Sequence, residues 1–283
     1  MAPARAQPTI AQPPYQAWNN DGGKPSATFH RTASGYLVRF PGIVDFRIDE
    51  GGAQVECVPV PGREAAWRVL FEQQLRPLLL SLAGEAVFHG AAVDIGGRGL
   101  VLLGPSGRGK STLTAALARR GHAFLGDDCL HLDLSGPVPL LLPQAAHVRL
   151  WPDSLARLAA GAQAMPPADD ASKPRLAAGV DLPHAGSAVP LAWACLLGEP
   201  VDGPPSLQSL DPRQRTMAWT ANAFVLDLKS PEVQRRNLQR SARLAAEVPL
   251  QRLDYRRDYD ELDAVLALLL AEVQGQACAD FPR

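Results

Sequence analysis

This sequence has few cysteines and no long apolar run, and each shortage argues against a class of protein. The four cysteines, Cys57, Cys129, Cys195 and Cys278, are widely scattered and lack the C-x-x-C spacing of a zinc or redox site. Scattered thiols suit a reducing compartment rather than a disulfide framework. The apolar runs are far shorter than the about 20 residues that span a bilayer, and the N-terminus lacks the apolar core of a signal peptide. We expect a cytoplasmic protein with no membrane partner.

The sequence also lacks an excess of either charge. Its 28 basic and 29 acidic residues give a formal net charge of −1, and no basic block stands out. Because a nucleic-acid surface needs clustered Lys and Arg, nucleic acid is not an expected partner. Hydrophobic residues make up 46% and charged residues 20% of the 283 positions, which is typical of a globular protein with one large or two modest domains.

Composition divides the chain into three parts. Residues 1–27 are rich in Ala, Pro, Gln, Gly and Ser and predict a flexible leader. Residues 28–84 predict a small N-terminal β-unit plus a helix, because short stretches alternate apolar and polar side chains before an apolar helical stripe over 64–83. Pro77 is expected to bend that helix. Residues 85–283 form the third and largest part.

A phosphate-binding motif stands in this third part. Residues 104–111 read Gly-Pro-Ser-Gly-Arg-Gly-Lys-Ser, which fits the G-x-x-x-x-G-K-[ST] pattern of a P-loop. An apolar run at 100–103 precedes it as an expected buried strand. Residues 112–120, free of Gly and Pro, follow as an expected helix whose positive end favours an anion. Because strand, loop and helix occur in the order that the motif demands, we interpret it as a nucleotide site rather than a chance match.

Each residue of the motif and the one after it is a predicted nucleotide contact. The predicted set is Gly104, Pro105, Ser106, Gly107, Arg108, Gly109, Lys110, Ser111 and Thr112. Glycines let the backbone N–H groups curl around phosphate oxygens. Lys110 brings a mobile charge to the β- and γ-phosphates and is also a predicted catalytic residue, while the Ser111 hydroxyl is placed to bind Mg²⁺. The expected cofactors are ATP and Mg²⁺.

Polar residues stand on both sides of the motif. His89 precedes it, after an apolar stretch, and Asp127-Asp128 follows the short apolar run 123–125. A strand–helix–strand crossover returns the chain in the same direction, so the acidic pair is expected at the phosphate end of the sheet. Other interpretations stay open on spacing alone, since the two aspartates could form a cap or turn and His89 could be a core histidine.

These segments resemble the HPr kinase/phosphorylase family of P-loop serine kinases. The similarity is carried by His89-Gly90, Val93-Asp94-Ile95, the P-loop, Arg120-Gly121-His122 and Asp127-Asp128, over about forty residues. The resemblance implies an α/β fold with a P-loop kinase core of the HPr kinase/phosphoenolpyruvate carboxykinase type, beside the small N-terminal β-rich unit. Residues 85–283 would then be the catalytic domain. It also implies that Asp127 is the base on a serine hydroxyl, that Asp128 lies near the metal, and that His89 is a further catalytic residue beside the phosphates.

The sequence departs from this family in one respect. The family has a signature after its acidic pair that supplies a glutamate to the metal, and residues 147–155 contain none. Asp153 is the only acid there, and we interpret it as a helix cap. Mg²⁺ is therefore expected on Ser111, Asp128, phosphates and water. Phosphorylase activity is not implied.

The resulting prediction is an ATP-dependent serine kinase. Its expected partner is a protein or peptide with an acceptor serine, and the resemblance includes small kinases that modify precursor peptides. Two alternatives stay open, a P-loop ATPase or nucleotide-binding regulator without an acceptor, and a small-molecule kinase. The sequence identifies neither the acceptor nor the preferred nucleotide base, and a homo-oligomer remains open.

Overall fold

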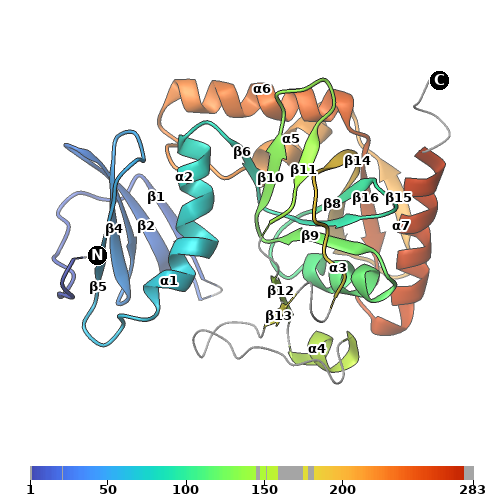
Figure 1. The fold of residues 1–283 in the computed structure, drawn as a ribbon, viewed down its shortest axis with the longest axis horizontal. Helices are drawn as coiled ribbons and strands as arrows, with labels where there is room; N and C mark the ends of the chain where they lie inside the picture. The colour runs from blue at the N-terminus through green and yellow to red at the C-terminus, as the bar shows by residue number, and fades with distance from the viewer. Residues whose placement is uncertain are drawn as a thin grey trace. The chain divides into compact units, whose positions relative to one another are not determined.

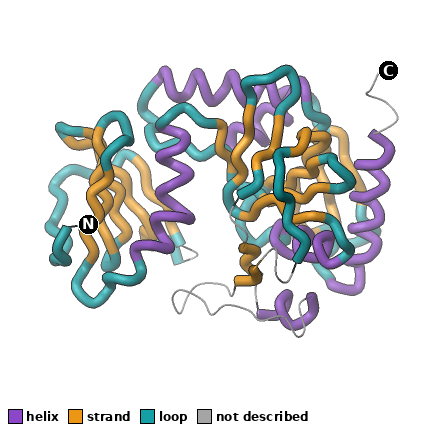
Figure 2. Tube along the Cα trace, viewed as in Figure 1, coloured by secondary structure: helices purple, strands orange, loops and turns teal. Residues whose placement is uncertain are grey.

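The computed structural model is a mixed α/β protein, as expected from the sequence (Figures 1 and 2). It describes residues 2–20, 22–144, 147–150, 152–158, 175–177 and 182–276. The chain divides into two compact units, one formed by residues 1–84 with 225–234 and the other by 85–224 with 235–283. No helix in the described ranges combines the length and apolar character needed to cross a membrane.

The first unit is built on a five-stranded antiparallel sheet. Its strands follow chain order: β1 (Gln16–Asn19), β2 (Pro25–Thr32), β3 (Gly35–Phe40), β4 (Val44–Asp49) and β5 (Val55–Pro59). Because successive side chains point to opposite faces, every second residue can enter the core. Phe29, Val38 and Phe46 do so and have no exposed surface.

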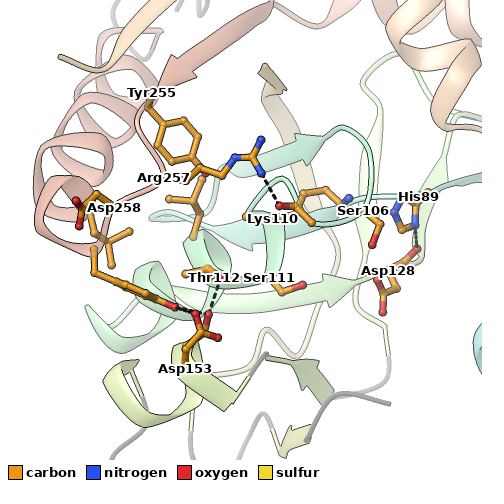
Figure 3. Close-up of a pocket in the computed structure, with 16 residues that line it drawn as sticks. His89, Ser106, Lys110, Ser111, Thr112, Asp128, Asp153, Tyr255, Arg257 and Asp258 are labelled. Atoms are coloured by element: carbon orange, nitrogen blue, oxygen red, sulfur yellow. Dashed lines mark hydrogen bonds between the residues drawn. The ribbon is translucent and has the colours of Figure 1, made fainter. Parts of the chain in front are cut away.

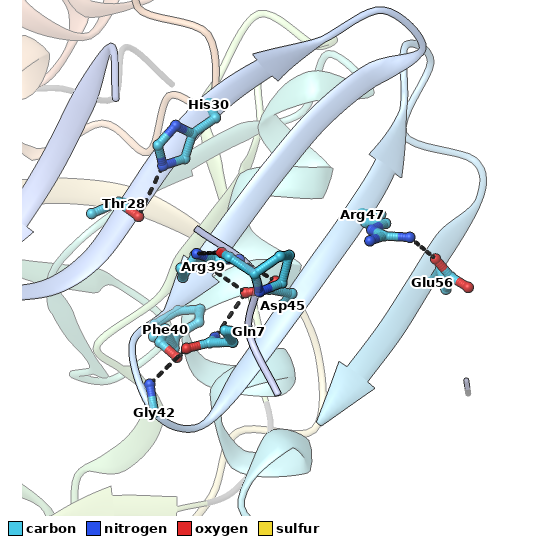
Figure 4. A network of polar contacts seen from close by, with 10 residues as sticks. Gln7, Thr28, His30, Arg39, Phe40, Gly42, Asp45, Arg47 and Glu56 are labelled. Atoms are coloured by element: carbon cyan, nitrogen blue, oxygen red, sulfur yellow. Dashed lines mark hydrogen bonds and ion pairs between the residues drawn. The ribbon is translucent and has the colours of Figure 1, made fainter. Parts of the chain in front are cut away.

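The N-terminal residues differ from the flexible leader expected from composition. β1 pairs with β2, and the backbone N–H groups of Ala2 and Arg5 donate to carbonyls of β5. Gln7 Nε2 donates to Asp45 Oδ1 at 2.8 Å, and Arg39 Nε donates to the same oxygen at 2.8 Å (Figure 4). These partners lie far along the chain, so the local composition could not reveal them.

The helix predicted over residues 64–83 contains a wider turn. α1 (Trp67–Leu70) leads through a π-helical turn, η1 (Phe71–Leu75), into α2 (Arg76–Leu82). The Arg76 N–H donates to the Phe71 carbonyl, the longer spacing of a π turn. Pro77 follows directly and has no N–H to donate. The distortion expected at Pro77 thus takes the form of a π turn.

The second unit centres on a mixed nine-stranded sheet. Its main path is β6 (Ala86–Phe88), β10 (Leu130–Asp133), β11 (Leu140–Leu142), β14 (Val189–Pro200), β8 (Gly99–Leu103), β7 (Ala91–Asp94) and β9 (Ala123–Asp127), with β16 (Leu250–Tyr255) joining β14 and β15 (Ser206–Ser209). β14 runs parallel to β8 and β16, and the other pairs are antiparallel. A separate pair joins β12 (His147–Arg149) and β13 (Arg175–Ala177).

Both faces of this sheet are covered by helices. Leu100 and Leu102 of β8 share a buried cluster with residues of α3 (Lys110–Arg119) and α7 (Leu262–Gln276). The alternate residues Val101 and Leu103 share another with residues of α5 (Pro212–Asn222) and α6 (Pro231–Glu247). A strand buried on both faces reads as a continuous apolar run, which explains the sequence before the P-loop. The remaining helices are α4 (Pro152–Leu158) and η2 (Tyr259–Glu261).

β9 returns in the direction of β8 but is not its neighbour. β7 lies between them and is antiparallel to both. The register of β9 shifts between the partners Ala92 and Val93, so Leu125 is an extra residue of the kind found in a β-bulge. The end of β9, which carries the acidic pair, therefore lies at the same end of the sheet as the P-loop.

Candidate functional site

The P-loop joins β8 to α3 and adopts a backbone that its glycines permit. Gly104, Gly107 and Gly109 have φ angles of 133°, 76° and 96°, which residues with a Cβ rarely adopt. Gly109 meets a second constraint, because a Cβ there would lie 2.5 Å from the Tyr255 hydroxyl oxygen. The loop conformation thus depends on glycine, and the first turn of α3 opens directly onto a pocket.

Lys110 lies inside the loop. The residue is 5% exposed, and its Nζ donates to the carbonyl oxygens of Gly104 at 2.6 Å and Pro105 at 3.0 Å. The ammonium is thereby held at the centre of the curl of the backbone. A phosphate entering the loop would meet a cation already in place.

The structure brings the acidic pair to the P-loop. Ser111 Oγ donates to Asp127 Oδ1 at 3.0 Å, and Asp128 lines the pocket. Asp128 has a φ of 65°, a left-handed conformation that Asp tolerates better than most residues. The end of β9 therefore places the Asp127 carboxylate against the hydroxyl that the motif assigns to the metal, and the turn after it places Asp128 in the same pocket.

His89 lies at the same end of the pocket as Asp128 (Figure 3). Its Nδ1 is 3.0 Å from the carbonyl oxygen of Asp128. Because a carbonyl only accepts, Nδ1 is the protonated nitrogen of this ring. Phe224 packs edge-on against the ring, with the centroids 6.2 Å apart. These contacts orient the imidazole beside the acidic pair.

Asn222, the last residue of α5, is a positioning residue that sequence reasoning missed. Its Oδ1 accepts from the Gly104 N–H at 3.2 Å, and its backbone carbonyl accepts from the His89 N–H at 2.6 Å. Its Nδ2 donates to the Ala218 carbonyl at 2.8 Å. One asparagine thus fixes the start of the P-loop relative to His89. No local pattern marks such a residue, since only the fold brings these segments together.

A second wall of the pocket comes from the end of β16 and the residues that follow it, which the sequence placed in no site. Tyr255 Oη donates to the Arg108 carbonyl at 3.0 Å, and Arg257 Nη1 donates to the Gly107 carbonyl at 2.9 Å. Burial raises the pKa of Tyr255 to about 12, so its hydroxyl stays protonated and able to donate at neutral pH. This wall supports the P-loop from outside.

Not every predicted contact faces the pocket. Ser106, Gly107, Gly109, Lys110, Ser111 and Thr112 line it, whereas Gly104, Pro105, Arg108 and Asp127 do not. The Arg108 guanidinium instead pairs with the Glu199 carboxylate, and the hydrogen bond from Arg108 lowers the pKa of Glu199. The side chain of Arg108 is therefore engaged away from the predicted nucleotide contacts.

Asp153 takes part in a chain of hydrogen bonds rather than preceding its helix as a cap. Thr112 Oγ1 lies 3.2 Å from Ser154 Oγ, which lies 2.7 Å from Tyr259 Oη. Tyr259 Oη donates to Asp153 Oδ2 at 2.9 Å. The sequence showed neither Ser154 nor Tyr259 as part of the site, because their partners come from three separate elements.

The oxygen atoms near Ser111 suit a magnesium ion. Its hydroxyl and the carboxylates of Asp127 and Asp128 are hard ligands of the type that Mg²⁺ prefers. Among the residues that the structure describes, no three His, Cys, Asp or Glu side chains form a ligand cluster. A hydroxyl with one or two carboxylates fits a magnesium ion that completes its shell with phosphates and water.

Comparison with known proteins points to one family. The family model described as HPr Serine kinase C-terminal domain matches residues 80–142. The HPr kinase/phosphorylase of Bacillus pumilus is 36% identical over 74 residues, covering 24% of this chain and 24% of that protein. The HPr kinase/phosphorylase of Limosilactobacillus reuteri is 32% identical over 98 residues, covering 32% of this chain and 31% of that protein. The chain thus matches 24% to 31% of the length of these curated relatives.

A solved structure gives a weaker likeness. The Hpr(Ser) kinase/phosphatase from Coxiella burnetii shares 13% identity with a TM-score of 0.37, over 68% of this chain and 90% of that one. At that TM-score the likeness supports no statement about this chain, and the relationship rests on the sequence matches. The matched residues 80–142 hold His89, the P-loop, Asp127 and Asp128. The chain is therefore HPr kinase-like, through the segment that carries these residues.

Proposed function

We propose that this protein is an ATP- and Mg²⁺-dependent serine kinase, which transfers the γ-phosphoryl group of ATP to a serine hydroxyl. The observation that carries the proposal is the 3.0 Å hydrogen bond from Ser111 Oγ to Asp127 Oδ1, within a segment related to the HPr kinases. A P-loop alone indicates a nucleotide. A carboxylate beside it adds a proton acceptor for transfer to a hydroxyl.

The proposal includes the architecture of the catalytic part. We assign the expected catalytic region 85–283, apart from residues 225–234, to an HPr kinase-like P-loop domain of the phosphoenolpyruvate carboxykinase type. Residues 28–84 belong to a separate β-rich unit, together with residues 1–27 and 225–234. The support is the insertion of antiparallel β7 between β8 and β9. A P-loop within a sheet of mixed direction agrees with the antiparallel-rich core that the resemblance implies.

The chain's own groups bind and orient the triphosphate in this proposal. Backbone N–H groups of residues 106–112 surround the phosphates, and Lys110 exchanges its contacts with two loop carbonyls for phosphate oxygens. Positioning and electrostatic stabilisation then provide most of the rate enhancement. Mg²⁺, held through Ser111 and Asp128, would neutralise charge between the β- and γ-phosphates.

The two aspartates have distinct proposed roles. Asp127 takes the proton of the acceptor serine, as its place in the motif implies, and Asp128 lies nearer the metal. One contact favours the reverse assignment, because Asp127 touches the Ser111 hydroxyl while Asp128 lines the pocket. His89, protonated on Nδ1 toward the Asp128 carbonyl, holds the turn that carries both carboxylates. Separate substitutions of the two aspartates distinguish these assignments.

A transfer assay with labelled ATP tests the proposal. Two acceptors are offered, an HPr-type carrier protein, because the matched relatives are HPr kinase/phosphorylases, and serine-containing precursor peptides. We expect label on serine, dependent on Mg²⁺, with equal release of ADP. Release of ADP without labelled protein or peptide would contradict the proposal in favour of an ATPase. Label on a small hydroxyl compound alone would favour a small-molecule kinase.

A further inference from the structure

The pocket has two chemically different ends. Figure 3 shows His89, Ser106 and Asp128 at one end, Asp153, Tyr255 and Asp258 at the other, and Ser111 and Thr112 between them. Proton transfer and metal binding need only the first end. The second end is formed by α4 and the segment from β16 to α7. Apart from the support that Tyr255 and Arg257 give the P-loop, it has no role in the proposed transfer.

The order of phosphate contacts along the P-loop indicates which part of a nucleotide lies at each end of the pocket. The lysine of the motif contacts the β- and γ-phosphates, and the following hydroxyl belongs to the metal. Here that hydroxyl is hydrogen-bonded to Asp127, so the γ-phosphate belongs at the end with the acidic pair. The nucleoside leaves the triphosphate from its opposite end. It must therefore extend past Thr112, toward α4 and η2.

The second end carries groups that suit a nucleoside. Leu113 and Leu262 contribute apolar surface to the pocket, and Tyr259 contributes an aromatic ring. The Arg157 guanidinium lies over this ring, 4.8 Å from its centroid, which leaves the opposite face for a base. The Asp153 carboxylate accepts a hydrogen bond from Tyr259, and a carboxylate offers further acceptor positions.

Thr112 links the two ends of the pocket. Its hydroxyl lies 3.2 Å from Ser154 Oγ, and Ser154, which is 2% exposed, contacts Tyr259 Oη at 2.7 Å. The first turn of α3 is thereby connected through the buried Ser154 hydroxyl to the aromatic ring. This connection fixes Tyr259 relative to the P-loop before any ligand binds, which reduces the ordering cost of binding.

We propose that this second end is the nucleoside subsite, in which Tyr259 stacks on the base and Asp153 accepts a hydrogen bond from a ribose hydroxyl. The proposal rests on the proposed function, since it assumes that the P-loop holds a triphosphate. It makes Asp153 and Tyr259 specificity-determining residues.

The subsite is tested by calorimetric titration of the full chain in the presence of Mg²⁺. The three ligands are ATP, dATP and inorganic tripolyphosphate. Base stacking contributes enough that ATP should bind roughly 10- to 100-fold more tightly than tripolyphosphate. Tyr259→Ala should abolish most of this advantage and leave tripolyphosphate affinity within about twofold. Tyr259→Phe, which keeps the ring, should retain most of it.

A second variant tests the sugar contact without removing the ring. Asp153→Asn should reduce a preference of roughly 10-fold for ATP over dATP to near equality, because a charged acceptor is lost. Asp260→Asn is the matched control, since it removes the same charge from an exposed residue of η2 outside the pocket lining. That control should leave both ratios unchanged. Melting curves verify that each variant is folded.

The outcomes separate the subsite from the kinase proposal. Equal affinity of the wild-type protein for ATP and tripolyphosphate would overturn the subsite and leave the phosphate site standing. A parallel loss of ATP and tripolyphosphate binding in folded Tyr259→Ala would also overturn it, by showing a supporting role only. Binding of neither ligand by the wild-type protein would overturn the proposed function and the subsite together.

Discussion

Lys110 is the residue around which the phosphate loop closes. Its ammonium contacts two loop carbonyls and the residue is 5% exposed. Lys110→Ala removes the charge while the glycines keep the loop backbone, so the variant should fold. Nucleotide affinity should fall, and the rate of phosphoryl transfer should fall to background. Binding is measured by calorimetry and transfer with labelled ATP. Wild-type transfer by a folded Lys110→Ala protein would exclude this loop as the site.

The roles of Asp127 and Asp128 can be distinguished by substituting each with Asn. If Asp127 is the base, Asp127→Asn keeps its size and hydrogen bonding but loses its proton affinity. Transfer should then fall by roughly 10²–10⁴ while ATP binding persists. Asp128→Asn should instead weaken the Mg²⁺-dependent part of ATP binding. An exchange of these two phenotypes would assign the base to Asp128. A loss of thermal stability in both, with normal activity per folded molecule, would make the pair structural.

We expect His30 to make the first unit less stable in acid. Burial, and secondly the Arg39 guanidinium, lower the pKa of His30 below its usual 6.5. The unfolded chain therefore binds this proton first, and the free energy of unfolding decreases as pH falls below about 6.5 until the lower folded pKa is passed. His30→Gln should flatten the pH dependence of the opening free energy that hydrogen exchange reports for the β2–β4 amides.

His122 provides the matched control for His30. Burial lowers its pKa as well, but it lies in the second unit. His122→Gln should leave unchanged the pH dependence of the opening free energy that hydrogen exchange reports for the β2–β4 amides. If this opening free energy changes equally with pH in the wild-type protein and in His30→Gln, His30 does not cause the acid sensitivity.

At the scale of elements, the contact between the end of β16 and the P-loop explains why Gly109 is glycine. The Tyr255 hydroxyl donates to the Arg108 carbonyl at 3.0 Å and lies 2.5 Å from the position of a Cβ on Gly109. Gly109→Ala combines this overlap with a φ of 96°, so it should distort the loop. Tyr255→Phe relieves the overlap but also removes one loop hydrogen bond.

This contact predicts a specific order among three variants. Tyr255→Phe should weaken ATP binding by about tenfold, the usual effect of one hydrogen bond, and Gly109→Ala should weaken it further. The double variant should bind better than Gly109→Ala alone, because the hydroxyl that overlaps the new Cβ is gone. Affinities come from calorimetry with Mg²⁺ and ATP. Strictly additive losses would show that the hydroxyl and residue 109 do not interact.

Elements could be predicted from the sequence more readily than their neighbours could. The runs at residues 35–40 and 100–103 mark strands because side-chain alternation or continuous burial is a local property. The insertion of β7 between β8 and β9 could not be predicted, since pairing depends on contacts between distant segments. The same reason explains why the pairing of the N-terminal residues could not be predicted, since their partners lie on β2 and β5. Within the site, backbone chemistry makes the P-loop recognisable, whereas Asn222 and Tyr259 act singly and leave no pattern.

At the scale of the molecule, the described pocket belongs to one unit. Every residue that lines it lies in the unit formed by 85–224 and 235–283, whereas the antiparallel sheet β1–β5 has its own buried residues. A ligand that binds only the folded state stabilises it by mass action, by about 2.7 kcal/mol at 100 times its Kd. That stabilisation should appear first in the unit that contains the site.

Hydrogen exchange with and without Mg²⁺ and ATP tests this division. Amides of β8, α3 and β9 should exchange more slowly with ligand, while those of β2–β4 should change little, because no residue of that sheet lines the pocket. Lys110→Ala is the control, since loss of its charge should remove the protection around the P-loop and leave the β2–β4 rates as they were. Equal protection of both sheets would show that the two units open in one cooperative step, so that nucleotide binding in the second unit would also stabilise the first.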